Sequence, residues 1–254
     1  MVKGLKISLL TIIIIFLVAF MFALIKNDFK FNTSSKLIYD ETYSLNDVKD
    51  FNIDVKSQDI KILSSNDDSI SVKVYAKSKK NIYLYKDEDN NIVINQEKRK
   101  GSICVGFCFG NYNVIKIYLP KDYDGKFNIK SKSGDITSDI DNYLAFNVKL
   151  TSGDIDIKNI KSLVGRTTSG DIEIKDLSSY IDFKTTSGDI EIDNFDIQRD
   201  SSITVTSGDV DIDHIENVYV SSSVKSGDVK VKNNDRYAPY ELKIQTTSGD
   251  ITVN

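Results

Sequence analysis

The feature that most constrains the fold of this chain is a triplet, Ser-Gly-Asp, which occurs seven times in its C-terminal half. The position numbers of successive triplets differ by 19, 17, 18, 20, 19 and 22, and the triplets hold seven of the 13 glycines in the chain. The glycines are Gly134, Gly153, Gly170, Gly188, Gly208, Gly227 and Gly249. A near-constant period of this length indicates a repeat architecture in which each unit packs on its neighbours.

Both flanks of the triplet alternate between apolar and polar residues, as in Phe127-Asn128-Ile129 before it and Ile172-Glu173-Ile174 after it. Period two is typical of half-buried strands. The phase shifts by one residue across the triplet, which marks a corner, because glycine tolerates positive φ and Ser and Asp bond nearby amides. We therefore expect an all-β fold, a parallel β-solenoid in which one repeat forms one coil. A single-layer meander would leave one face of its apolar strands exposed.

A further copy of the repeat runs from Phe51 to Ile62, with Gln58 in place of the glycine. The position numbers of Gln58 and Gly134 differ by 76, four times 19, so we expect the solenoid to begin near Phe51. The predicted organisation is a cytoplasmic tail (1–6), a transmembrane anchor (7–25), a linker with a first strand (26–50), degenerate coils with a hairpin insertion near 97–112 (51–126), and regular coils (127–254). The regular coils carry 14 basic and 22 acidic side chains, a net charge of −8.

The N-terminal segment from Ile7 to Ile25 is an uninterrupted run without a charge, Gly or Pro. As a helix it would span about 28 Å, close to the hydrocarbon thickness of a bilayer. A cleaved signal peptide is the alternative, but it usually has a shorter apolar region and a small-x-small cleavage site. Bulky Met21 stands two residues before Ala23, the one suitable cleavage residue. We therefore predict a single-pass anchor in the cell membrane, with the C-terminal domain extracytoplasmic.

The chain resembles a family of bacterial membrane-anchored proteins named "putative adhesins", whose adhesin domain has no assigned function. The resemblance rests on the anchor, on Ile117-Tyr118-Leu119-Pro120-Lys121 leading into Phe127-Asn128-Ile129-Lys130, and on the Ser-Gly-Asp-Ile/Val copies. It implies a β-solenoid and a role at the cell envelope, with a link to the envelope-stress response. No catalytic residues come with the family.

Composition narrows the function classes. A single His, His214, argues against His-based triads and His-rich metal sites. A net charge of −4 argues against nucleic-acid binding. The triplets follow one another at short intervals, which leaves no long loops to wall a catalytic cleft. We therefore predict a non-enzymatic protein without a cofactor; a polysaccharide-active β-helix enzyme is the weaker alternative.

The aspartates of the triplets offer the one candidate metal site. Stacked coils would align them in a row, and rows of oxygen ligands suit Ca²⁺. A second acidic row, broken by Thr137, Lys230 and Thr252, would hold Asp156, Glu173, Glu191 and Asp211. We favour a structural role in which each triplet aspartate caps its own corner, with a Ca²⁺-dependent adhesion module as the alternative. The aspartates are Asp135, Asp154, Asp171, Asp189, Asp209, Asp228 and Asp250.

Two further predictions concern the cysteines of the insertion and the loop before the last repeat. Cys104 and Cys108 lie in the predicted hairpin insertion, where a short-loop disulfide and two free thiols are equal alternatives. The last repeat ends at Asn254, so we expect its coil to lie at the end of the solenoid. We expect the preceding loop to fold over that coil, with Tyr237 and Tyr240 covering apolar surface, and a plain surface loop is the alternative.

The function that these features predict is binding, adhesion or scaffolding at the bacterial cell envelope. The partners we expect are the membrane, through the anchor, and an envelope protein or polysaccharide that the sequence does not identify. A spacer that holds the hairpin insertion away from the membrane is the structural alternative.

Overall fold

The computed structural model describes residues 35–97, 113–232 and 234–254, and the protein is all-β there apart from one turn of 3-10 helix, η1 (Leu45–Asp47). Residues 35–254 form one compact unit. Its strands are β1 (Lys36–Ser44), β2 (Phe51–Asp54), β3 (Asp59–Ser64), β4 (Ser69–Ala76), β5 (Ile82–Lys86), β6 (Ile92–Gln96), β7 (Val114–Leu119), β8 (Lys126–Lys130), β9 (Ile136–Asp139), β10 (Leu144–Lys149), β11 (Ile155–Ser169), β12 (Ile172–Ser187), β13 (Ile190–Phe195), β14 (Ser201–Ser207), β15 (Val210–Ile215), β16 (Val218–Ser226), β17 (Val229–Val231), β18 (Tyr240–Ser248) and β19 (Ile251–Val253).

No helix in the described ranges is long and apolar enough to cross a membrane. The anchor predicted at 7–25 lies outside those ranges, as do Cys104 and Cys108.

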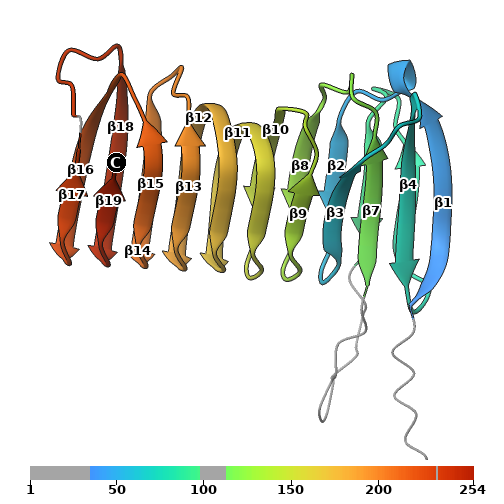
Figure 1. Cartoon of the computed structure of the whole chain (residues 1–254). Coiled ribbons are helices and arrows are strands. Elements are labelled where there is room, and N and C mark those ends of the chain that lie inside the picture. Colours follow the sequence, from blue (N-terminus) through green and yellow to red (C-terminus); the bar gives the residue numbers. More distant parts are fainter. Residues whose placement is uncertain (1–34, 98–112, 233) are drawn as a thin grey trace, which may run out of the picture. The chain divides into compact units, whose positions relative to one another are not determined.

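The strands pair into two ladders that meet at the Ser-Gly-Asp corners (Figure 1). The first ladder holds the strand before each corner, and the second ladder holds the strand after it. The first runs β5-β6-β2-β8-β10-β11-β12-β14-β18-β16. The second runs β1-β4-β7-β3-β9-β11-β12-β13-β15-β19-β17. β11 and β12 belong to both ladders, because each runs from one corner to the next.

Pairing is parallel from β6 to β16 in the first ladder and from β7 to β17 in the second. The predicted all-β, solenoid-like fold is therefore confirmed. Alternation of apolar and polar residues turns one side of each strand inward, and these side chains form one continuous core. Phe127 stacks on Phe51 and on Phe146, with ring centroids 4.7 and 5.1 Å apart. Such aromatic pairs add about 0.5–1.5 kcal/mol each beyond the burial of their area.

The corners explain why glycine recurs. All seven triplet glycines have positive φ, between +118° and +142°. At Gly188 an added Cβ would lie 2.2 Å from the backbone oxygen of Gly170 in the neighbouring coil, far inside van der Waals contact. The Gly188 amide also donates to the Ser207 carbonyl at 3.1 Å, so neighbouring coils touch backbone to backbone at the corner.

The N-terminal end departs from the coil order that the spacing of Gln58 and Gly134 suggested. Phe51 pairs with Phe127, so the β2–β3 coil stacks directly on the β8–β9 coil, with none between them. The intervening chain runs outward instead: β6 and β7 flank β2 and β3 on their far side, and β4, β5 and β1 add antiparallel strands. The difference of 76 between the position numbers of Gln58 and Gly134 therefore does not correspond to four stacked coils.

Gln58 takes the glycine's place at the corner of the β2–β3 coil. Its side chain is buried, and its Oε1 accepts hydrogen bonds from the amides of Lys56 and Ser57 at 3.2 and 3.1 Å. The corner is thereby held by a side chain where the other copies use a close backbone contact.

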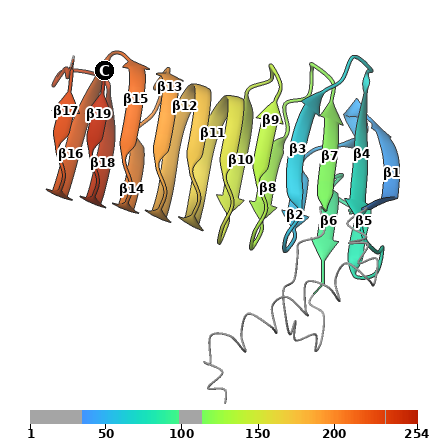
Figure 2. The same cartoon turned by 60° about the horizontal axis from the view of Figure 1, so that its bottom comes forward.

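The C-terminal end contradicts the prediction that the last repeat forms the terminal coil. β18 pairs with β14 on one side and with β16 on the other, and β19 likewise lies between β15 and β17 (Figure 2). The last repeat is thus inserted between the two before it, and the β16–β17 coil lies at the end. The predicted cap is also wrong for Tyr237, because 96% of its surface is exposed, while Tyr240 packs partly against the core. Lys225 lies on β16, Lys230 lies on β17 and Lys232 follows β17, and lysines on an edge discourage further strand pairing.

Candidate functional site

The corner aspartates form one hydrogen-bonded row along the solenoid. In each step the Oδ1 of one aspartate accepts the backbone N–H of the aspartate in the next coil, over 2.7–3.1 Å. The order is Asp59, Asp135, Asp154, Asp171, Asp189, Asp209, Asp250 and Asp228, which includes the inserted coil and the Gln58 copy. Each carboxylate except that of Asp228, the last in the row, therefore ties its coil to the next one, so these aspartates bond the amide of the neighbouring corner.

The same row bears on the calcium alternative. Each bonded carboxylate has one oxygen committed to an amide, which leaves a single oxygen to offer a cation. In the described ranges no three or more His, Cys, Asp or Glu side chains converge as metal ligands do. In the structure these aspartates cap the corners by accepting hydrogen bonds from backbone amides.

Strand register brings a second set of carboxylates into line on the outer face of the second ladder. Asp156, Glu173, Glu191 and Asp211 occupy matching positions on β11, β12, β13 and β15, and we call them the acidic row. Thr137 and Thr252 continue the row at its two ends, at the positions where the sequence indicated breaks. Slight desolvation of this exposed side chain, and then the charges of Glu173 and other acidic neighbours, raise the pKa of the Glu191 carboxyl above its usual value. The face is therefore a concentrated source of negative potential.

The outer face of the first ladder carries a matching row of the opposite sign, which the sequence analysis missed. Lys130, Lys149, Arg166 and Lys184 occupy matching positions on β8, β10, β11 and β12, and we call them the basic row. All four side chains are exposed. The signal was present, since each stands three residues before the serine of its triplet. It was obscured because the same position holds Thr204, Gln245 and Ser223 in the later copies.

The basic row borders a groove that crosses the ends of β6, β2, β8, β10 and β11. Its volume is about 560 Å³, and its lining includes Lys56, Lys132 and three members of the basic row. The acidic residues in the lining are Asp54 and Glu97, so the formal charge of the lining is five positive minus two negative, or +3. We call this the basic groove.

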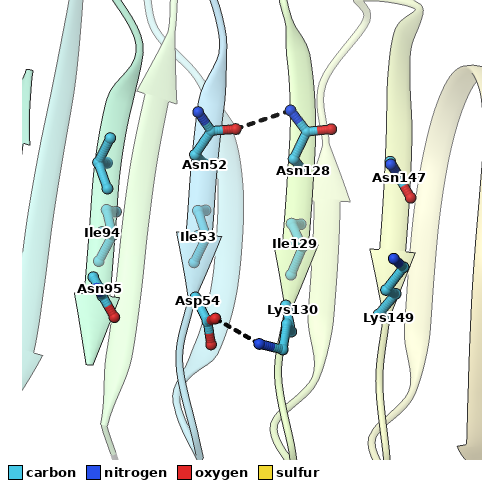
Figure 3. Close-up of a pocket in the computed structure, with 11 residues that line it drawn as sticks. Asn52, Ile53, Asp54, Ile94, Asn95, Asn128, Ile129, Lys130, Asn147 and Lys149 are labelled. Atoms are coloured by element: carbon cyan, nitrogen blue, oxygen red, sulfur yellow. Dashed lines mark hydrogen bonds and ion pairs between the residues drawn. The ribbon is translucent and has the colours of Figure 1, made fainter. Parts of the chain in front are cut away.

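Two contacts hold two of the groove's five cations in place. Lys130 Nζ lies 2.8 Å from Asp54 Oδ2, and Lys56 Nζ donates to the Glu97 carbonyl at 3.0 Å. Beside them runs a row of amides in which Asn128 Nδ2 donates to Asn52 Oδ1 at 2.9 Å, with Asn147 next in register (Figure 3). The face therefore offers cations and neutral hydrogen-bonding groups in parallel rows.

His214 lies on β15. Its side chain is exposed, and its Nδ1 lies 3.1 Å from the Asp193 carbonyl oxygen. Neither the corner aspartates nor the basic row comes with a neighbouring histidine that would serve as a base.

Comparison with known proteins agrees with this architecture. The model of one protein family, described as Toastrack DUF4097, matches residues 48–254. The chain belongs to the Toastrack DUF4097 family. The match covers every coil described above, and the family's description names no reaction. No protein of curated function matches the chain.

Several solved structures resemble this Toastrack chain, among them three with a TM-score of 0.40. A "putative cell adhesion protein" from Clostridium sporogenes is 12% identical, over 86% of this chain and 98% of that one. A "putative adhesin" from Bacteroides fragilis is 15% identical, over 86% and 97%. A "putative lipid binding protein" from Parabacteroides distasonis is 18% identical, over 88% and 98%.

Proposed function

We propose that this Toastrack chain is a non-enzymatic binding or scaffolding module of the bacterial cell envelope, anchored in the membrane by residues 7–25. The single observation that carries the proposal is the register of its charged side chains. Four basic and four acidic residues repeat at matching positions of neighbouring strands, on the first and second ladders respectively. Backbone pairing fixes their spacing at about 4.8 Å, so each face is a rigid, periodic surface.

Such a surface suits binding better than catalysis. A catalytic site needs a few groups that converge on one substrate in a pocket closed by loops. Here the charged groups lie side by side along open faces, and the return from β11 to β12 and from β12 to β13 adds no long loop. Periodic faces recognise partners that are themselves extended, such as polymers or the surface of another protein.

The proposed location rests on the sequence. Lys3 and Lys6 before the apolar run are nearly balanced by Lys26 and Lys30 after it, so the orientation rests on the economy of a short N-terminus inside and a large domain, residues 35–254, outside the membrane. Fractionation of cells should place the chain in the membrane, and protease added to intact protoplasts should remove the C-terminal domain. Recovery of mature protein that begins near Leu24 from the culture medium would contradict the anchor.

The binding role is tested on the full chain in a nonionic detergent, mixed with envelopes from cells that lack it. Sedimentation of the envelopes should carry the chain down in a saturable manner. Charge-neutral variants of the basic row and of the acidic row then report which face is used. An unchanged, non-saturable background for the wild-type chain and for both variants would reject a binding role. Induction of an envelope-stress reporter on deletion of the chain would test the proposed link to stress signalling.

A Ca²⁺-dependent adhesion module remains the second candidate, because each corner aspartate keeps one carboxylate oxygen for a cation. Its test is envelope binding in excess Ca²⁺ and in chelator. This candidate requires binding to be lost in chelator, whereas the first requires it to stay.

A further inference from the structure

Most charges of the basic row have no ion-pair partner among the residues that the structure describes. Lys130 is paired with Asp54, but Lys149, Arg166 and Lys184 make no ion pair within the described residues. They are nevertheless held about 4.8 Å apart by strand pairing, at a distance where like charges repel. Asp182, in the neighbouring row, instead accepts a hydrogen bond from Ser202 at 2.7 Å. An anion laid over the row would relieve this repulsion.

The length of the row indicates a polymer rather than a small anion. Four cations on neighbouring strands extend over about 14 Å, three strand spacings. The groove beside them is lined by residues at the ends of five neighbouring strands, β6, β2, β8, β10 and β11, so a ligand that fills it would also lie across the strands. A linear chain with repeated negative charges would contact each cation in turn.

The chemistry of the lining disfavours a membrane surface as the occupant. A protein that docks on anionic lipid usually adds apolar side chains that enter the bilayer. The apolar residues of the groove, Val55 and Leu150, are buried, at 2% and 6% exposure. The exposed remainder of the lining includes Thr151 and Thr168, and the amide row beside the groove holds half-buried Asn52 and Asn128 and exposed Asn147, which suits hydroxyl groups.

We propose that the first face binds a linear, hydroxyl-bearing polyanion along the basic row and the basic groove. The proposal rests on the binding role proposed above and names its ligand class. The negative groups are phosphodiesters or carboxylates, both of which Arg166 can bind through two parallel hydrogen bonds while lysines act as point charges. The amide row would accept or donate hydrogen bonds to the hydroxyl groups between the charges.

The test uses the full chain in a nonionic detergent, with fluorescently labelled poly(glycerol phosphate) and polygalacturonate as probes. Fluorescence anisotropy measures their affinity at 50–200 mM salt. Four contacts at about 0.7 released counterions each predict a slope near −3 for log K against log salt, or roughly 50-fold weaker binding over that range. Binding of either polymer with this slope supports the proposal, and the preferred polymer identifies the anionic group.

The decisive variant replaces Lys149, Arg166 and Lys184 by Gln. Its matched control replaces three lysines that face outward on the second ladder, Lys61, Lys175 and Lys230, and so changes the net charge equally. The first variant should weaken binding at least 30-fold at 50 mM salt and make the slope less steep by about 2, because three of the four basic-row contacts are lost. The control should stay within about threefold of wild type. Equal losses in the two variants, or none in either, would overturn the proposal.

A second copy of this chain is the competing occupant, because the acidic row has the same spacing as the basic row. Sedimentation without polymer at 50 mM salt separates the two. Self-association that both the basic-row variant and Glu173→Gln/Glu191→Gln abolish, together with no polymer binding, would overturn the proposal in favour of face-to-face assembly. If neither polymer binds while saturable envelope binding persists, the ligand class is wrong and the binding role stands.

Discussion

Replacing the corner glycine Gly188 by valine tests the backbone contact on which the stacking of coils depends. Gly188 has φ of +122°, and an added Cβ would lie 2.2 Å from the Gly170 oxygen. Real contacts of this kind stay beyond about 3.0 Å, so the corner must move by about 0.8 Å. That movement strains the bond from the Gly188 amide to Ser207, at 3.1 Å, and the bond from the Asp189 amide to Asp171, at 2.9 Å.

The expected cost follows from these terms. A β-branched residue at positive φ costs about 1–3 kcal/mol, and each weakened hydrogen bond about 1 kcal/mol. The sum, about 3–5 kcal/mol, corresponds to a fall in melting temperature of about 10 °C for a unit of this size. Thermal unfolding followed by circular dichroism measures it. Thr186→Val is the matched control, because Thr186 is exposed two residues away and the change adds no strain. A Gly188→Val protein that melts within 2 °C of this control would refute the corner geometry.

Three further predictions concern the corner row, the acidic row and the strand order. Asp189→Ala should destabilise the protein by about 1.5–3 kcal/mol, because the Asp209 amide loses a charged acceptor, and Asp189→Asn should cost less than half as much. The wild-type protein should melt at the same temperature in Ca²⁺ and in chelator. A Ca²⁺-dependent shift of several degrees would show that the row binds metal. Because the folded-state pKa of Glu191 is raised, the folded protein binds more protons between the usual glutamate pKa and the raised one, so stability falls as pH rises through that window. Glu191→Gln should flatten this fall in pH-dependent unfolding, and an identical pH profile would contradict the crowding of charges. Deleting residues 240–254 should expose residues 216–239 to protease, because β18 and β19 are the sole lateral neighbours of β16 and β17 among the described strands; an unchanged cleavage rate would be inconsistent with the inserted coil.

The coil itself was predictable from the sequence, and the order of the coils was not. A period of two and a triplet at a near-constant interval are local properties, and they predict strands, corners and parallel stacking. Which coil lies beside which is decided by long-range pairing, and every copy presents nearly the same apolar face. Ile203 accepts Ile244 as a neighbour as readily as it would accept a residue of the next repeat. The inserted coil and the adjacency of Phe51 and Phe127 therefore left no mark in the spacing.

Of the two charged rows, the sequence predicted the acidic one and missed the basic one. The acidic row was recognised because its members directly follow the triplet, where the repeats are easiest to align. The basic row lies three residues before the triplet, and its composition changes to neutral residues after Lys184. The basic groove depends on Lys56 and Glu97, which reach it because β6 pairs with β2 and β2 pairs with β8. Only the three-dimensional order brings those residues together.

The inserted coil also determines when the C-terminal end can finish folding. In a simple solenoid each coil packs on the one already made, so structure grows with the emerging chain. Here the strand pairs β14–β18 and β15–β19 join residues 41 positions apart, as Asp209 and Asp250 illustrate. Until β18 and β19 leave the ribosome or the translocation channel, β16 and β17 lack a lateral partner. The end of the solenoid therefore takes its final strand order only after β18 and β19 have been made, and the growing chain has an open edge until then.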